Sequence, residues 1–220
     1  WNALVIQGYA QAHWALPDAG FDTAAIDLLE TLWDNAFVNG ELCHQIIESV
    51  AEGMAFLDDY SSLGNALVEC YSLQADQKFL DRAATLGRLI KMKFPSTSEL
   101  IFRPYSSEIQ EAWQTHIEVE DNVIPSANAM CAHFFWRLGE LLENTDYTDW
   151  AKEALHAMHP KVFRFGPSYS EWLSLALLEA YGQNEMVVCG PEGKSAAQQL
   201  TKESYAPTTP IYWSHPMLAS

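Results

Sequence analysis

The sequence predicts a mainly α-helical fold of repeated αα-hairpins, with a short β-hairpin insertion and a small β-α-β element near its C-terminal end. Most of the chain carries apolar residues at three- and four-residue steps, the period of an amphipathic helix. Long helical segments are followed, after a short turn, by a second helix that opens on an aromatic residue and alanine, and this pairing recurs. Period-two alternation is confined to short stretches between helices and near the end.

The first half of the chain is expected to form two helical pairs. Residues 17–20 separate the two helices of the first pair, and Pro95 ends the last helix of the second pair. Residues 38–55 are less regular and include an amphipathic piece, 42–54. The expected helices run from Asn2 to Leu16, from Asp22 to Ala36, from the Asp58-Asp59 pair to Leu73, and from Gln77 to Met92.

The second half begins with a change of pattern between residues 98 and 124. Leu100–Arg103 and Thr115–Val119 are typical of strands, and we expect them to form the inserted hairpin. Helices are then expected from Ser126 to Glu143, from Tyr147 to Met158 and from Ser168 to Tyr181. A buried strand at 185–190, a helix at 195–203 and a strand at 209–213 complete the prediction. This divides the chain into a helical part, 1–183, and a β-α-β extension, 184–220.

Composition limits the classes of partner. A formal net charge of -17 argues against nucleic acid and anionic membranes, which both require Lys and Arg on the contact face. The sequence contains neither a signal peptide nor an apolar run of membrane-spanning length, and its four cysteines lie far apart. These features predict a cytoplasmic protein with buried free thiols. Because the chain starts abruptly at Trp1, we expect it to be a piece of a longer protein.

The stretch Leu57-Asp58-Asp59-Tyr60 is the strongest candidate for a functional site. An apolar run stops at two adjacent carboxylates, and a helical pattern begins there. One carboxylate can cap the helix and gain from its dipole. The other is not needed for capping, and a carboxylate beside buried apolar residues requires a reason. We therefore expect one Asp to cap the helix and the other to face a cavity, without specifying which.

Polar residues recur in the first turn of the first helix of each hairpin. If the hairpins pack around an axis, these groups converge at one rim, where two carboxylates can act as acid and base, or as acid and nucleophile, on a sugar. Asp58 and Asp59 are the catalytic candidates, and Trp1 belongs to the aromatic residues suited to stacking on sugar rings. The candidate substrate-binding residues are Trp1, Asn2, Tyr60, Ser126 and Asn128. The alternative is that all of these residues are plain helix caps.

Adjacent aspartates cannot easily lie across a substrate from each other at the separation of about 5–9 Å that glycoside hydrolysis uses. A second acid is therefore expected elsewhere in the chain. The candidates are Glu118, Glu120, Asp121 and Glu171.

Two other patterns are interpreted as structural. Gly190-Pro191-Glu192-Gly193-Lys194-Ser195 follows a strand and opens a helix, but its first glycine lies two residues too close to Gly-Lys-Ser for a phosphate-binding loop. His156 and His159 lie three residues apart, and no Cys or carboxylate completes a metal set at ligand spacing. We therefore expect neither a metal nor a cofactor.

Several motifs together resemble the spermatogenesis-associated protein 20 family. They are Trp1-Asn2-Ala3-Leu4, Leu57-Asp58-Asp59-Tyr60, Ile124-Pro125-Ser126-Ala127-Asn128, Val187-Val188-Cys189-Gly190-Pro191 and Tyr205-Ala206-Pro207. The resemblance implies an N-terminal thioredoxin-like domain, absent here, followed by an (α/α) barrel akin to six-hairpin glycosidases and N-acylglucosamine 2-epimerases. This chain would then be a partial (α/α)6 toroid. Its exposed inner helices would be covered by the missing part or by a second copy of the chain.

The resemblance supports two functional hypotheses. In the first, the barrel acts on or binds a small carbohydrate, as a glycosidase-like or epimerase-like protein. In the second, it is a non-catalytic binding or scaffolding module for the absent thioredoxin-like domain. Mutation of the carboxylates separates the two hypotheses, because it would remove activity in the first and only stability in the second.

Overall fold

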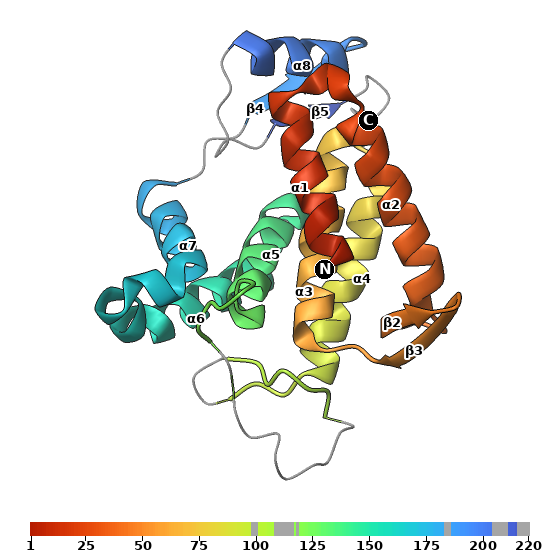
Figure 1. Cartoon of the computed structure of the whole chain (residues 1–220). Coiled ribbons are helices and arrows are strands. Elements are labelled where there is room, and N and C mark those ends of the chain that lie inside the picture. Colours follow the sequence, from red (N-terminus) through yellow and green to blue (C-terminus); the bar gives the residue numbers. More distant parts are fainter. Residues whose placement is uncertain (98–100, 108–116, 118, 183–185, 204–210, 215–220) are drawn as a thin grey trace.

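The computed structural model describes residues 1–97, 101–107, 117, 119–182, 186–203 and 211–214. Three αα-hairpins stand side by side and α7 follows them (Figure 1), so the mainly helical fold is confirmed. The hairpins are α1 (Asn2–Ala15) with α2 (Phe21–Ala36), α3 (Leu57–Gln74) with α4 (Gln77–Lys93), and α5 (Ala127–Leu142) with α6 (Thr145–Arg164). The last of these helices, α7, spans Ser170–Tyr181. None of the described helices is long and apolar enough to cross a membrane.

The first helices of the three hairpins run parallel, which brings their N-terminal ends to one end of the molecule. Two hydrogen bonds show the common direction of α1 and α3, because residue numbers increase along both helices from one bond to the next. Gln7 donates to the Ser62 carbonyl at 2.9 Å, and Gln11 donates to Glu69 at 2.8 Å. The same holds for α3 and α5. Asn65 donates to the Met130 carbonyl at 2.9 Å, and further along both helices Arg137 donates to Glu69. The same end therefore carries the starts of α1, α3 and α5.

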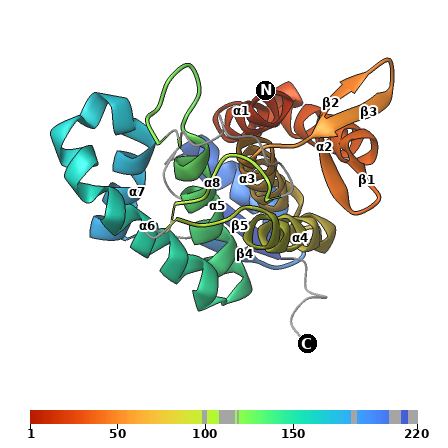
Figure 2. The same ribbon diagram turned by 90° about the horizontal axis from the view of Figure 1, so that it is seen from below.

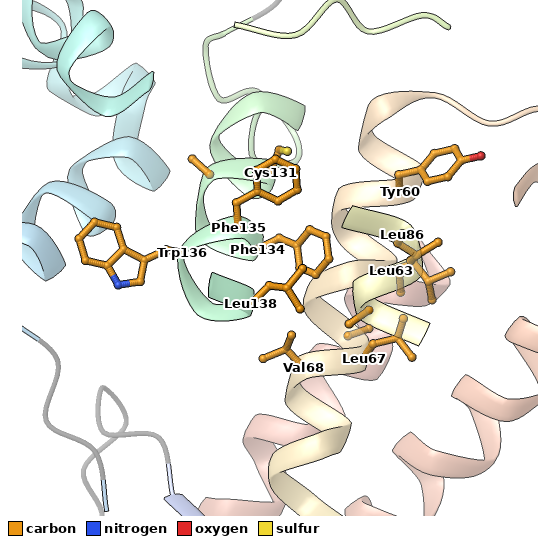
Figure 3. Packing of buried hydrophobic residues seen from close by; sticks show 14 of the residues in the cluster. Tyr60, Leu63, Leu67, Val68, Leu86, Cys131, Phe134, Phe135, Trp136 and Leu138 are labelled. Atoms are coloured by element: carbon orange, nitrogen blue, oxygen red, sulfur yellow. The ribbon is translucent and has the colours of Figure 1, made fainter. Parts of the chain in front are cut away.

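The core is densest between α3 and α5. Almost the whole of α3 is buried, because α1, α4 and α5 surround it. Phe134 of α5 points at α3 (Figure 3) and is 0% exposed. Its ring lies over Gly64, where a Cβ atom would approach ring atoms to 2.7 Å. Glycine is thus required at this position by the close approach of the two helices.

Residues 37–54 form a three-stranded antiparallel sheet, and here the expectation of an irregular segment was wrong. Its strands are β1 (Phe37–Val38), β2 (Glu41–Ile47) and β3 (Val50–Met54). Both connections are two-residue turns with positive φ, 54° and 83° at Asn39-Gly40 and 49° and 66° at Glu48-Ser49. Asn-Gly between strands is a strong hairpin signal, because both residues tolerate this conformation. The sheet projects beside the start of α3 (Figure 1).

The hairpin expected between residues 98 and 124 falls partly outside the described residues, including Leu100 and Thr115. Phe102 forms an isolated antiparallel bridge with Ser96, and 101–107 crosses the end of the molecule where α3 and α5 begin (Figure 2). This segment is fixed to α3 because the Leu57 amide donates to the Pro104 carbonyl at 3.0 Å.

Helix α6 is longer than expected, because it continues through Pro160 to Arg164. Proline in a helix interior removes one backbone hydrogen bond. Met158 and Val162, four residues apart on either side of it, are 1% and 0% exposed. Their burial offsets the lost bond, so the chain stays helical until the short 3₁₀ turn Gly166–Tyr169.

A small β-α-β unit lies against α1 and α3, at the end opposite the starts of these helices (Figure 1). Strand β4 (Met186–Cys189) pairs in parallel with β5 (Ile211–Ser214), and α8 (Gly193–Glu203) connects them, as the sequence predicts. The expected burial of the first strand was wrong: Val187 is 61% exposed and Cys189 is also exposed. A two-stranded sheet covered on one face leaves every second side chain outside. The other cysteines are free too, with Cys70 and Cys131 buried and Cys43 partly buried.

Candidate functional site

The two aspartates at the start of α3 have different surroundings. Asp59 turns back to cap the helix: its Oδ2 accepts a hydrogen bond from the Phe56 amide at 2.8 Å. The same oxygen lies 2.8 Å from Nδ1 of His44, a residue of β2. Asp59 therefore fixes the start of α3 and ties the sheet to it, which is the structural role that one of the two carboxylates was expected to have.

Asp58 instead lines a cavity of about 310 Å³, called here the Asp58 cavity. Burial of the carboxyl group raises the pKa of Asp58, and the neighbouring charge of Asp59 raises it further. Backbone amides at the helix start and the His44 ring lower the pKa of Asp58, but by less than burial and Asp59 raise it. A carboxyl group whose pKa is raised keeps its proton to higher pH than an ordinary aspartate, which suits it to general acid chemistry.

Aromatic and polar groups line the Asp58 cavity. Phe56 and Tyr105 are among the lining residues, with ring centroids 5.4 Å apart in an edge-to-face arrangement. Glu120 and Asn122 line the same cavity from the loop that precedes α5. The Tyr169 hydroxyl donates a hydrogen bond to Oε1 of Glu120 at 3.0 Å, and burial followed by this contact raises the pKa of Tyr169. Two carboxylates, Asp58 and Glu120, thus share one cavity with aromatic rings.

Ser126 and Asn128 also line the Asp58 cavity, but their side chains bond backbone groups. The Ser126 hydroxyl caps α5 by accepting from the Ala129 amide at 3.2 Å. Asn128 is 1% exposed, and its amide accepts from the Phe102 amide at 2.9 Å and donates to the Phe102 carbonyl at 3.0 Å. Asn128 therefore holds the 101–105 segment in place as a cavity wall.

Trp1, Asn2 and Asp59 line a second cavity of about 140 Å³ between α1, α2 and β2. Trp1 is 77% exposed. Tyr60 points into the protein and is 2% exposed; its hydroxyl accepts from the Leu42 amide at 3.3 Å and its ring lies against Phe94. The residues expected at one rim do lie at one end of the molecule, but they are divided between two cavities and the core.

The other acids weighed as a second carboxylate have structural contacts. Asp121 accepts from the amides of Ser126 and Glu171, each at 2.9 Å, and so joins the starts of α5 and α7. The Glu171 carboxylate lies 3.5 Å from His133. Glu118 lies outside the described residues. Of the three candidates that the structure describes, Glu120 lines the Asp58 cavity, and Asp121 and Glu171 do not.

Sequence reasoning missed the contributions of His44, Phe56 and Tyr105. His44 was overlooked because its segment was expected to be irregular; the Asn39-Gly40 turn was the signal that could have placed it on a strand. Phe56 was visible as part of the apolar run before the aspartates. The sequence gives no local signal for Tyr105, which reaches the cavity through contacts between segments far apart in the chain.

No protein-family model matches the chain. A search of known proteins found similarity to uncharacterized protein B0495.5 of Caenorhabditis elegans, with 24% identity over 161 residues. The match covers 70% of this chain and 22% of that protein, so the chain corresponds to a small part of a much longer relative.

Proposed function

We propose that the Asp58 cavity binds a small carbohydrate and carries out acid–base chemistry on it, in the manner of a glycosidase or an epimerase. The observation that carries the proposal is the pairing of two carboxylates in one cavity, one of which, Asp58, has a raised pKa. Sugar-processing sites use such a pair: a protonated carboxyl group and an ionised one with different environments. The resemblance to the spermatogenesis-associated protein 20 family supports the same class.

In this proposal Asp58 is the proton donor. For a glycoside, its carboxyl proton passes to the glycosidic oxygen as the bond from that oxygen to the anomeric carbon breaks. Glu120, oriented by the Tyr169 hydroxyl, acts as the ionised partner, either as nucleophile or as base toward water. Asp59 does not touch the sugar; burial of Asp58 raises the pKa of that carboxyl group, and the Asp59 charge adds to the effect.

The cavity walls fit a sugar ring. Phe56 and Tyr105 offer aromatic surface for the C–H face of a sugar, and Asn122 offers hydrogen-bonding groups for hydroxyls. A cavity of about 310 Å³ lies at the small end of the range typical of ligand pockets. A monosaccharide or a single terminal sugar unit is therefore the expected occupant.

The test is a binding and turnover screen with free monosaccharides and 4-nitrophenyl glycosides. Saturation-transfer NMR reports binding and release of nitrophenol reports hydrolysis. Reducing sugars are followed by proton NMR for epimerisation. We expect the unmodified chain to bind at least one sugar, with turnover lowered about 100-fold or more in Asp58→Asn and Glu120→Gln. Absence of binding to every sugar, or full turnover in Asp58→Asn, would refute the proposal.

A second candidate function is a non-catalytic binding module within a longer protein. It is favoured by large apolar side chains exposed on α7 and at the end of α6: Phe163 is 74% exposed, Leu177 58% and Tyr181 85%. Surfaces of this kind mark protein contacts. This function predicts that Asp58→Asn changes no measurable activity and that Leu177→Ser weakens association with the remaining part of the full-length protein.

A further inference from the structure

Two histidines of α6 and one glutamate of α7 form a cluster at the edge of the helical array. His156, His159 and Glu179 each offer one ligand atom, and these atoms all lie within 4.8 Å of one another. His156 Nε2 is 2.8 Å from Glu179 Oε1, and the two imidazole rings have centroids 5.0 Å apart. The cluster is separate from the Asp58 cavity, whose lining residues lie between Phe56 and Asn128.

The fold explains why the three groups meet. Residues three apart lie on the same side of a helix, so His156 and His159 point to one face of α6. Helix α7 packs beside α6 (Figure 2), and Leu155 of α6 and Leu175 of α7 are both fully buried. This packing brings Glu179, near the end of α7, beside the histidine pair. The carboxylate that the sequence spacing did not supply therefore comes from the next helix.

The donor set is typical of a zinc site. Zinc prefers imidazole nitrogen and carboxylate oxygen in a tetrahedral arrangement, and sites with two histidines, one glutamate and an open fourth position are well represented. Bonds of about 2.0–2.2 Å place neighbouring ligand atoms about 3.3 Å apart around a tetrahedral zinc. The cluster must therefore close by about 1.5 Å at its widest. His156 is exposed, so rotation of its side chain can supply this movement.

An ion pair without metal accounts for only part of the cluster. The contact between His156 and Glu179 requires no third group. His159 is not part of that contact: its ring lies against Phe163 and beside the His156 ring. A metal ion bound by all three groups would account for the position of His159 as well. The formal net charge of -17 also favours cation binding.

We propose that His156, His159 and Glu179 bind one zinc ion, with water in the fourth position, and that the ion clamps α7 to α6. Helix α7 is short and lies at the end of the array, so a ligand bridge adds a constraint where packing is sparse.

The test is titration of the whole chain with zinc chloride by calorimetry, together with His159→Gln. This variant is decisive because it removes one ligand and keeps the contact between His156 and Glu179. His133→Gln is the matched control: His133 also faces α7, through Ser174 and Glu171, but lies outside the cluster. We expect one zinc per chain, affinity weakened at least about tenfold in His159→Gln and in Glu179→Gln, and unchanged affinity in the control.

Cobalt substitution identifies the ligand atoms independently. Nitrogen and oxygen ligands give visible bands without a thiolate-to-cobalt charge-transfer band, whereas binding through Cys43 or Cys189 would produce that band. Zinc should also raise the melting temperature of the unmodified chain and leave that of His159→Gln unchanged. The proposal is overturned by the absence of saturable zinc binding, by equal affinity in His159→Gln, or by a thiolate band.

Discussion

At the scale of single residues, the main result is the different environments of Asp58 and Asp59. Both stand in the first turn of α3, and both are partly buried. Asp59 bonds the Phe56 amide and His44, whereas Asp58 lines the cavity beside Glu120. A sequence pattern can place two carboxylates at a helix start, but His44, which contacts Asp59, comes from β2, and residues that line the cavity with Asp58 come from the loop at 120–125. The division of roles therefore depends on tertiary contacts.

The raised pKa of Asp58 predicts a pH dependence of stability. Because the folded-state pKa lies above the unfolded value near 3.8, the folded protein holds an extra proton between these two pH values. Asp58 therefore lowers the free energy of unfolding as pH rises through this window, and the loss persists above it. Asp58→Asn should be more stable than the unmodified chain at neutral pH, and the advantage should shrink at the acidic side of the window. Urea denaturation at a series of pH values measures the difference.

Asp59, unlike Asp58, is expected to raise the free energy of unfolding at neutral pH. Asp59→Ala removes the hydrogen bond to the Phe56 amide and the contact with His44. Loss of a capping side chain costs about 1 kcal/mol, so this variant should have a lower free energy of unfolding at neutral pH. Urea denaturation beside Asp58→Asn is the comparison; equal effects of the two substitutions would contradict the assigned roles.

At the scale of elements, the helices and their pairing could be predicted because amphipathic periodicity persists over many residues. The sheet at 37–54 was missed because an amphipathic segment of that length fits either a helix or strands, and only the Asn39-Gly40 turn distinguishes them. The end of α6 was missed because local rules stop a helix at Pro160, whereas burial of Val162 extends it. In both cases information outside the local pattern decided the structure.

The contact between α3 and α5 gives a prediction at this scale. Gly64→Ala places a methyl group 2.7 Å from ring atoms of Phe134, which is fully buried. Overpacking of this kind should lower the free energy of unfolding by about 1–3 kcal/mol. Gly8→Ala is the matched control, because a Cβ there meets nothing within 4 Å. It should instead raise stability by about 0.5–1 kcal/mol through helix propensity. Thermal unfolding of both variants checks the contrast.

At the scale of the whole molecule, a polar chain links the hairpins across the core. Glu69 of α3 bonds Gln11 of α1 and Arg137 of α5, and Arg137 also interacts with Tyr212 of β5. This chain connects three helices and the β-α-β unit. The parallel order of α1, α3 and α5, which brings the polar helix starts to one end, is maintained by these bonds together with the apolar core.

Breaking this chain should be costly. Arg137→Met leaves the Glu69 carboxylate, 10% exposed, without its cationic partner. Removal of one member of a buried pair costs about 3 kcal/mol, and the double variant with Glu69→Gln should recover part of that loss. A double-mutant cycle by urea denaturation measures the coupling; additive effects would show that the two residues stabilise the fold independently.

The central claim, that Asp58 is the protonated carboxyl group of the site, is tested most directly by carbon-13 NMR titration of the side-chain carboxyl groups. Asp58 should titrate above the value of 3.8 that is usual for aspartate, and its pKa should fall in Asp59→Asn because the neighbouring negative charge is removed. Titration of Asp58 at or below 3.8, or an unchanged pKa in Asp59→Asn, would contradict the account.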